Sequence, residues 1–513
     1  MRSHLWETCR IGRMEFKNRI VMPPMVTNYG TAEGEATGRS ERHYEARASG
    51  GVGLIILEAT YVHPDGRAFS NQLGLSDDRL IPGMERLARV IHQHGAKVAV
   101  QLHHGGRMAS SAFTRKQPVA PSPLAGPGGD VPRELAVAEI RQIAGCFAEA
   151  ASRAKRAGLD GVELHAAHGY LIDQFISRSS NKRQDEYGGE LQNRARFLIE
   201  VIRSVREAVG KDFPVWCRIN GRQYGLAGPT PLEDAQQIAR MAQDATADAI
   251  HVSAGGPQAP VLLTTPTFVP AVIADLAEGI KRAVTVPVIA VGRIIPEAGE
   301  VIVRQGRADL VAIGKGLLAD PDLPRKAESG RLEDINPCIV CFACLEDLRR
   351  PGIVGIRCRV NPALGNEEKA KIVPAQKRRK VLVVGGGPAG MQAAATAARR
   401  GHQVTLWEKR TRLGGQLAAA AIAPHKDRMG VLDTYLQAQL KGLGVRVDLG
   451  TEATAAMIQG LRPDVVVLAT GVRQVVPDIP GLGKARLAQA IDVLEGKTEV
   501  GERVVVIGGE LVG

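Results

Sequence analysis

Aromatic residues are scarce in this chain of 513 residues, which holds three Trp, seven Tyr and nine Phe, 4% in all. Lysine and arginine outnumber aspartate and glutamate by 66 to 54, a net charge of +12, but the basic residues are dispersed. Nucleic-acid binding depends on a clustered basic stripe and on aromatic platforms for the bases. The composition therefore predicts no nucleic-acid partner, and the basic excess suits phosphate-bearing small molecules equally well.

Long apolar runs are also missing. No run reaches the roughly 18–20 residues that cross a bilayer, and the N-terminus, MRSHLWETCRIGRMEFKNRI, lacks the apolar stretch and small-residue cleavage site of a signal peptide. We therefore expect no membrane association and a cytoplasmic location. The length exceeds what one ordinary hydrophobic core supports, which predicts two or three domains.

Cysteine is rare except in one segment. Cys9, Cys146 and Cys217 are scattered, whereas the other four follow the pattern Cys338-x2-Cys341-x2-Cys344-x13-Cys358. In a cytosolic protein such crowding indicates metal binding rather than disulfides. Structural zinc is usually held by two well-separated Cys-x2-Cys pairs, whereas three close cysteines and a distant fourth are typical of a [4Fe–4S] cluster. The spacing favours the cluster, with zinc as the alternative.

The first 330 residues repeat a β-branched run, a loop and an amphipathic helical pattern. Eight such runs occur: Ile20–Met25, Gly53–Ala59, Lys97–His103, Gly161–His165, Pro214–Asn220, Ala249–Gly255, Pro287–Ile294 and Leu310–Gly316. Eight nearly continuous apolar strands that alternate with helices predict an α/β fold, a (β/α)8 TIM barrel over residues 1–330.

The predicted strands also end alike, in polar residues that a packed core would not favour. These are Gln101, His103, His165, Arg218, Ser253, Arg293 and Lys315. Active sites of this fold lie at the C-terminal ends of the strands. The repeated pattern therefore predicts a ligand site there.

Three further segments follow the predicted barrel. Residues 331–365 hold the four cysteines, and the charged, proline-containing residues 366–379 are expected to form a linker. Residues 380–513 begin with a strand, a glycine turn, a helix and a second strand. The fold class is thus a TIM barrel, an iron–sulfur segment and a Rossmann-like nucleotide-binding region.

The glycine turn has the spacing of a dinucleotide site. Gly385-x-Gly387-x-x-Gly390 follows the predicted strand, and Glu408 stands 18 residues past the last glycine. Glycines let the backbone approach a pyrophosphate at a helix N-terminus, and the acid can accept from ribose hydroxyls. A merely tight turn would leave Glu408 without a role.

The last residues suggest a second such turn. Arg503–Ile507 is predicted to be a strand, and Gly508–Gly513 resembles the beginning of a dinucleotide loop in which Glu510 replaces the middle glycine. We expect the sequence to be a fragment that lacks a complete NAD(P)H site.

The segment GVELHAAHGYLIDQFI places His165, His168 and Tyr170 just past a predicted strand. Imidazoles can donate hydrogen bonds to a carbonyl oxygen, and a phenol can deliver a proton. Metal binding ranks lower, because His-x-x-His has no third ligand nearby.

The stretches VMPPM, ELHAAHGYL and above all SNKRQDEYGGELQNRARF (180–197) resemble the old yellow enzyme superfamily. With the cysteines and the nucleotide region, the chain is similar to its multidomain branch, which contains 2,4-dienoyl-CoA reductase, 2-enoate reductases and trimethylamine dehydrogenase. The cysteine spacing is nearer to that of the amine dehydrogenase.

The resemblance implies an FMN site in the barrel. It implies flavin contacts at Pro24, Met25, Ala59 and Gln101, with Arg218 near the N1/C2 carbonyl edge, and a phosphate site made by Gly292, Arg293, Gly314 and Lys315. Lys315 departs from the arginine common at its position, so it keeps the charge but loses the bidentate fork.

The resemblance implies an NAD(P)H-dependent oxidoreductase that reduces activated C=C bonds of enoates, enones or dienoyl-CoA thioesters. Electrons would pass from NAD(P)H to FAD at Gly385–Gly390, then to the cluster and to FMN. His165 and His168 would polarise the substrate carbonyl while Tyr170 protonates the α-carbon.

The alternative is an amine dehydrogenase that passes electrons to a carrier protein. Such an enzyme needs an aromatic cage for a substituted ammonium, whereas this chain has Ala59-Thr60 and SAGGPQAP at the corresponding places. The sequence leaves the oligomeric state open, with a homo-oligomer as one option.

Overall fold

The computed structural model describes residues 3–126, 129–225, 227–256, 268–350, 352–472, 475–482 and 486–508. The chain divides into two compact units. The first comprises Met1–Thr265, Val269–Gly330 and Cys341–Ala370, and the second comprises Pro266–Phe268, Arg331–Val340 and Lys371–Gly513. No helix among the described residues combines the length and the apolar sequence that crossing a membrane requires.

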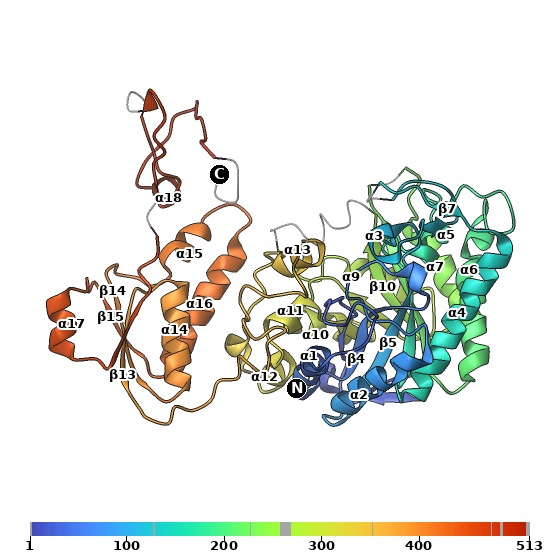
Figure 1. Ribbon diagram of the computed structural model, residues 1–513, viewed down its shortest axis with the longest axis horizontal. Coiled ribbons are helices and arrows are strands. Elements are labelled where there is room, and N and C mark those ends of the chain that lie inside the picture. The colour runs from blue at the N-terminus through green and yellow to red at the C-terminus, as the bar shows by residue number, and fades with distance from the viewer. Residues whose placement is uncertain are drawn as a thin grey trace. The chain divides into compact units, whose positions relative to one another are not determined.

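The first unit is built on a closed barrel of eight parallel strands (Figure 1). In chain order they are β3 Ile20–Met22, β4 Leu54–Tyr61, β5 Lys97–His103, β8 Gly161–Ala166, β9 Val215–Gln223, β10 Ile250–Gly255, β11 Val288–Val291 and β12 Leu310–Ala312. Each strand pairs with its neighbours in the chain, and β12 pairs with β3 to close the barrel. The predicted TIM barrel is confirmed.

Three strands, β3, β11 and β12, end earlier than predicted, and β12 ends at Ala312 before the turn into α11. Strand β3 ends at Met22 before Pro23 and Pro24, which have no N–H to donate to a neighbouring strand. Strand β11 ends at Val291 before Gly292, whose φ of 116° lies outside the extended region. The residues past these ends therefore form loops at the mouth of the barrel.

Helices surround the strands (Figure 1). The longer ones are α1 Gly38–Ser49, α2 Ile81–His92, α4 Val137–Arg156, α6 Leu191–Val209, α7 Leu232–Asp244, α9 Ala274–Lys281 and α10 Pro296–Arg304. Short elements are α3 Ser111–Thr114, α5 Leu171–Ile176, α11 Lys315–Ala319, α12 Leu323–Glu328, α13 Ala343–Arg349 and the strand pair β6 Val119–Ala120 and β7 Arg133–Glu134.

Helix α4 illustrates why these segments are helical. Ile140, Ala144, Phe147 and Ala151 recur every three or four residues and are all buried, so one apolar stripe faces the barrel. The Glu139 carboxylate accepts a hydrogen bond from the Ala136 N–H at 2.8 Å, which satisfies one of the donors left over at the helix N-terminus.

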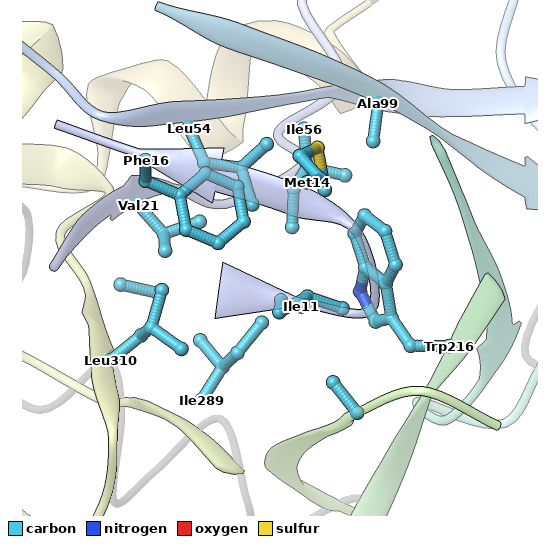
Figure 2. Packing of buried hydrophobic residues seen from close by; sticks show 12 residues of the cluster. Ile11, Met14, Phe16, Val21, Leu54, Ile56, Ala99, Trp216, Ile289 and Leu310 are labelled. Carbon is cyan, nitrogen blue, oxygen red and sulfur yellow. The ribbon is translucent and has the colours of Figure 1, made fainter. Parts of the chain in front are cut away.

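A hairpin that the sequence did not reveal fills the N-terminal end of the barrel. Strands β1 Cys9–Ile11 and β2 Met14–Phe16 pair antiparallel. Their inward residues join one apolar cluster with strand residues, as Figure 2 shows for Ile11, Met14, Phe16, Val21, Leu54, Ile56, Ala99, Trp216, Ile289 and Leu310. The barrel is thus a packed core at this end, and a site can form only at the opposite mouth.

Residues 341–370 are bound tightly to the barrel. The Tyr29 hydroxyl donates to the Ile356 carbonyl at 2.7 Å, and Asn361 Nδ2 donates to the Leu318 carbonyl at 2.9 Å. The fully buried guanidinium of Arg47 pairs with the Glu367 carboxylate at 2.8 Å. The segment that carries Cys341, Cys344 and Cys358 is therefore part of the barrel unit.

The second unit contains a four-stranded parallel sheet in the order β15-β14-β13-β16. The strands are β13 Lys380–Val384, β14 Gln403–Glu408, β15 Arg446–Leu449 and β16 Val465–Leu468. The helices are α14 Pro388–Arg399, α15 Gly415–Ala420, α16 Asp427–Gly442, α17 Ala455–Leu461 and α18 Ala490–Leu494. The chain runs from β13 outward to β14 and β15 and then returns to place β16 on the other side of β13, so the end of β13 is the switch point where ligands bind in such sheets.

The strand predicted at Arg503–Ile507 is wrong, because these residues form no strand within the described part of the chain. Val505 is 88% exposed, so the β-branched run has no neighbouring strand to pair with. The second glycine turn predicted at 508–513 lies, past Gly508, outside the described residues.

The hairpin generates a stability prediction. Phe16→Ala removes a fully buried ring and leaves a cavity, so we expect a loss of about 3–5 kcal/mol in the free energy of unfolding of the barrel. Urea unfolding, resolved into the transitions of the two units, measures the loss.

Glu15→Ala is the matched control, since its side chain is 51% exposed on the same strand and should change stability by only about 0–1 kcal/mol. Equal losses for the two variants would show that the hairpin does not anchor the barrel.

Candidate active site

The turn after β8 gathers His165, His168 and Tyr170 at the mouth of the barrel. The His165 ring lies 5.1 Å from the His168 ring and 4.9 Å from the Tyr170 ring between centroids, edge to face in both cases. The turn requires His168 in the left-handed region at φ 62°. The Asp173 carboxylate holds it by accepting from the Gly169 N–H at 2.7 Å. The rings of His168 and Tyr170 therefore both lie against the ring of His165.

His103, at the end of β5, completes this cluster. Its ring lies 4.3 Å from that of Tyr170, edge to face. Gln72 Nε2 donates to His103 Nδ1 at 3.1 Å, which leaves the proton of the neutral ring on Nε2. Burial lowers the pKa of His103 to about 3, and its Nε2 has no hydrogen-bond partner. His103 thus presents a neutral, unused donor beside Tyr170.

Both predicted substrate histidines are neutral. Burial, followed by the nearby rings and Arg218, holds the pKa of His165 and of His168 well below the ordinary value. His168 Nε2 lies 2.7 Å from the Ser253 hydroxyl, whereas His165 Nδ1 is buried without a partner. Each imidazole can therefore offer one N–H to a carbonyl oxygen while remaining uncharged.

Arg218 on β9 supplies the positive charge of the mouth. It is 7% exposed, and Nη2 donates to the Ser253 hydroxyl at 3.4 Å. Its Nε, together with the side-chain Nδ2 of Asn220, is buried without a hydrogen-bond partner. Unpaired buried donors are costly, so this set indicates that a ligand with several acceptor atoms belongs here. The carbonyl oxygens and ring nitrogens of FMN fit that requirement.

A buried polar layer lies beneath these residues. Its centre is Glu163, a residue that the sequence analysis did not predict as part of the site. Gln101 Nε2, Trp216 Nε1 and His251 Nδ1 each lie 2.7 Å from an oxygen of its carboxylate. The sequence does contain an indication of this layer, because an acidic residue stands inside the apolar run GVELHA. A buried strand tolerates a carboxylate only where hydrogen-bond donors surround it. Gln101, a predicted flavin contact, is thus held from below.

The loops after β11 and β12 contain the predicted phosphate residues. At Gly292, φ is 116° and a Cβ atom would lie 2.5 Å from Ile273 Cγ1, so only glycine fits. Arg293 follows in the left-handed region at φ 54°. Gly314 begins the turn into α11, where a Cβ atom would lie 3.0 Å from the Met25 sulfur. The glycines therefore allow a ligand to approach the backbones of these two loops closely.

The remaining predicted flavin residues lie near these loops. Pro24 and Ala59 are buried at the ends of β3 and β4, and the Ala59 carbonyl accepts from Gln72 at 2.8 Å. Met25 packs against the apolar cluster that includes Leu318 of α11. Lys315 Nζ lies 5.6 Å from the centre of the Phe342 ring, a neighbour of Cys341.

The glycine turn after β13 has the shape of a dinucleotide cradle. A Cβ atom on Gly385 would lie 2.3 Å from the Ala469 carbonyl oxygen, and one on Gly390 would lie 1.9 Å from the Gly385 carbonyl oxygen. Nothing lies within 4 Å of a Cβ built on Gly387 at the start of α14, which leaves space at this helix N-terminus. Such a space accepts a pyrophosphate.

Glu408 lies beside this cradle, at the end of β14. Its two carboxylate oxygens accept from the Gly386 N–H at 2.6 Å and from the Arg410 N–H at 2.8 Å. Each oxygen keeps a lone pair, so the residue can still accept from ribose hydroxyls.

The four cysteines lie in both units. Cys344 and Cys358 pack against the cluster of Tyr29, Leu318, Ile356 and Leu364, together with Met25, and Cys341 is exposed. The Cys338 carbonyl accepts from Arg428 Nε at 3.1 Å in the second unit. Among the described residues no three or more histidine, cysteine or carboxylate side chains are gathered as a metal site. The iron–sulfur cluster stays a prediction, although two of its proposed ligands pack against the same apolar cluster as the predicted flavin residue Met25.

Two family models match the chain. The model described as the NADH:flavin oxidoreductase / NADH oxidase family matches residues 4–334, and the pyridine nucleotide-disulphide oxidoreductase model matches residues 379–513. The two matches coincide with the barrel and with the unit that holds the glycine turn.

Relatives align over nearly the whole length. The chain is 47% identical to an NADH oxidase of Thermoanaerobacter brockii, over 99% of this chain and 80% of that protein. It is 35% identical to a cinnamate reductase of Clostridium sporogenes, over 99% and 80%. Among solved structures, a 2-naphthoyl-CoA reductase complex superposes with a TM-score of 0.94 at 34% identity, over 98% of this chain and 79% of that one.

These matches agree with the unpaired donors of the barrel mouth and with the glycine cradle of the second unit. The chain belongs to the NADH:flavin oxidoreductase / NADH oxidase family and is an oxidoreductase that uses flavin and a pyridine nucleotide.

Proposed function

We propose that this protein is an NAD(P)H-dependent ene-reductase that acts on an alkene conjugated to a carbonyl group. The observation that supports it best is the cluster of His165, His168 and Tyr170 beside the buried cation Arg218. Cinnamate reductase and 2-naphthoyl-CoA reductase, to which the chain is similar, are named for conjugated carbonyl substrates. An enoate or an acyl-CoA thioester is therefore the substrate class we expect.

FMN is the group that the barrel mouth is proposed to hold. Pro24, Met25, Ala59, Gln101 and Arg218 would contact its ring system, and its phosphate would lie against Gly292, Arg293, Gly314 and Lys315. When bound, FMN supplies the hydride that adds to the β-carbon of the substrate.

The protein's own residues handle the charge and the proton. The neutral imidazoles of His165 and His168 donate to the substrate carbonyl oxygen, where negative charge grows as the β-carbon receives hydride. Tyr170 gives its phenolic proton to the α-carbon. Since the His165 and Tyr170 rings are in contact, one bound carbonyl compound can reach both.

The other two groups are assigned by donor chemistry. Gly385, Gly387, Gly390 and Glu408 would hold FAD, which accepts a hydride from the nicotinamide and releases single electrons. Cys338, Cys341, Cys344 and Cys358 would hold a [4Fe–4S] cluster, which carries one electron at a time. We place the enzyme in the cytoplasm, where such thiolates stay reduced.

Replacement of Tyr170 tests the reaction. Tyr170→Phe keeps the ring contacts with His103 and His165 but removes the proton, so reoxidation of the reduced flavin by an enone or enoyl thioester should slow by about 10²-fold. Stopped-flow absorbance of the flavin measures this step.

Reduction of the flavin by dithionite, which requires no nicotinamide site, is the internal control in the same variant and should stay near the parental rate. Reoxidation at the parental rate would remove Tyr170 from the mechanism, and reduction by secondary or tertiary amines would favour the alternative, an amine dehydrogenase.

Metal and sulfide analysis tests the cluster. We expect about four iron and four sulfide per chain in the anaerobically purified protein, one iron per thiolate ligand. Cys358→Ser should lose both, whereas Cys146→Ser, on α4 away from the segment, should retain both. Stoichiometric zinc without sulfide would contradict the assignment.

Arg218→Ala tests the charge of the mouth. Removal of one preorganised charge where negative charge develops costs about 2.7–4 kcal/mol, so we expect flavin reduction to slow by about 10²–10³-fold and its midpoint potential to fall. Arg222→Ala is the matched control, because that side chain is exposed on the same strand. An unchanged rate and potential in Arg218→Ala would show that the guanidinium does not face the flavin.

A further inference from the structure

The Glu163 carboxylate is a fully enclosed charged group of the barrel interior. Its side chain is fully buried in the middle of β8, and three donors from three other strands converge on it. Oε1 accepts from Gln101 of β5, while Oε2 accepts from Trp216 of β9 and lies 2.7 Å from His251 Nδ1 of β10. A buried carboxylate is costly unless its oxygens accept hydrogen bonds, so the loss of any of the three donors would destabilise this arrangement.

The contact with Gln101 fixes the direction of its amide. A carboxylate can only accept, so the NH₂ group of Gln101 must face Glu163 and the amide oxygen must turn away from it. Gln101 is 1% exposed, so no solvent competes for this orientation. Glu163 thereby turns the amide oxygen of Gln101 away from itself, so that Gln101 can offer this oxygen as an acceptor, besides its second N–H, to the ligand of the mouth.

The carboxylate is also an opposite charge close to Arg218: Glu163 lies opposite Trp216 in the register of β8 and β9, and Arg218 follows two residues later on the same face of β9. Burial opposes its ionisation, but His251, Arg218 and Trp216 outweigh burial and lower the pKa of Glu163 below its ordinary value. Burial lowers the pKa of His251, so the ring is neutral and donates through Nδ1. The Glu163 anion therefore offsets part of the positive charge that Arg218 presents at the mouth.

We propose that Glu163 is a positioning residue that sets both the orientation of Gln101 and the effective charge of Arg218 toward the flavin. The inference rests on the proposed FMN site in the barrel. Glu163 itself lies in the layer below the mouth and acts only through these two side chains.

The decisive variant is Glu163→Gln, which keeps the size of the side chain and removes the charge. Without the anion, Arg218 stabilises the reduced, negatively charged flavin more strongly, so the FMN midpoint potential should rise. We expect about a tenfold shift of the two-electron equilibrium, about 30 mV. Trp216→Phe is the matched control, because it removes one donor to Glu163 and leaves the charge. In this variant the equilibrium constant of two-electron FMN reduction should stay within threefold of the parental value.

Flavin retention separates this inference from the proposed function. If the parent protein does not bind FMN, the proposed site is wrong. If the parent binds FMN and Glu163→Gln has the parental potential, or Trp216→Phe shifts the potential equally, the positioning role alone is wrong.

Glu163→Asp covers the case in which Glu163→Gln fails to fold. It keeps the charge but is too short to reach all three donors, so we expect the parental potential together with FMN binding at least tenfold weaker, measured by fluorescence titration of the apoprotein. Parental affinity in Glu163→Asp would overturn the role in orienting Gln101.

Discussion

The hydrogen bond from the Trp216 indole to the Glu163 carboxylate joins the two halves of the barrel interior. Below it, the indole packs with Ile11, Met14 and Phe16 in an apolar core. Above it, the interior is polar, and its donors converge on the mouth. One side chain thus serves both layers, because an indole offers an apolar body and a single N–H. The chemistry of the mouth depends on this division, since a site with a few directed polar groups needs a rigid apolar base.

The mouth combines neutral donors with one fixed cation. Burial keeps His103, His165 and His168 uncharged, so Arg218 carries the positive charge among these four residues. A site of this kind can hold an electron-rich ring through the cation and an uncharged carbonyl through the imidazoles. If all three imidazoles were protonated, the crowded cations would repel one another, which explains why the protein buries them.

Much of the barrel followed from the sequence because each buried parallel strand is a nearly continuous β-branched run. The mouth residues were found because polar groups repeat at the strand ends. The β1–β2 hairpin was missed because three-residue strands show no period. Glu163 and His251 were missed because partners 88 residues apart meet only after the barrel closes. The strand at Arg503–Ile507 was predicted from its β-branched composition alone, and composition does not show whether a neighbouring strand is present to pair with it. The roles of the site residues remain predictions.

The ion pair between Arg47 and Glu367 has a consequence for expressing the barrel without the rest of the chain. The match to the oxidoreductase family ends at residue 334, yet the carboxylate that neutralises Arg47 comes 33 residues later. A barrel expressed alone to that boundary would lack the carboxylate that pairs with Arg47, and removal of one partner of a buried ion pair costs about 3–5 kcal/mol where the other charge stays buried. The segment that carries Cys341, Cys344 and Cys358 therefore supplies part of the charge balance of the barrel unit and is not a separable appendage.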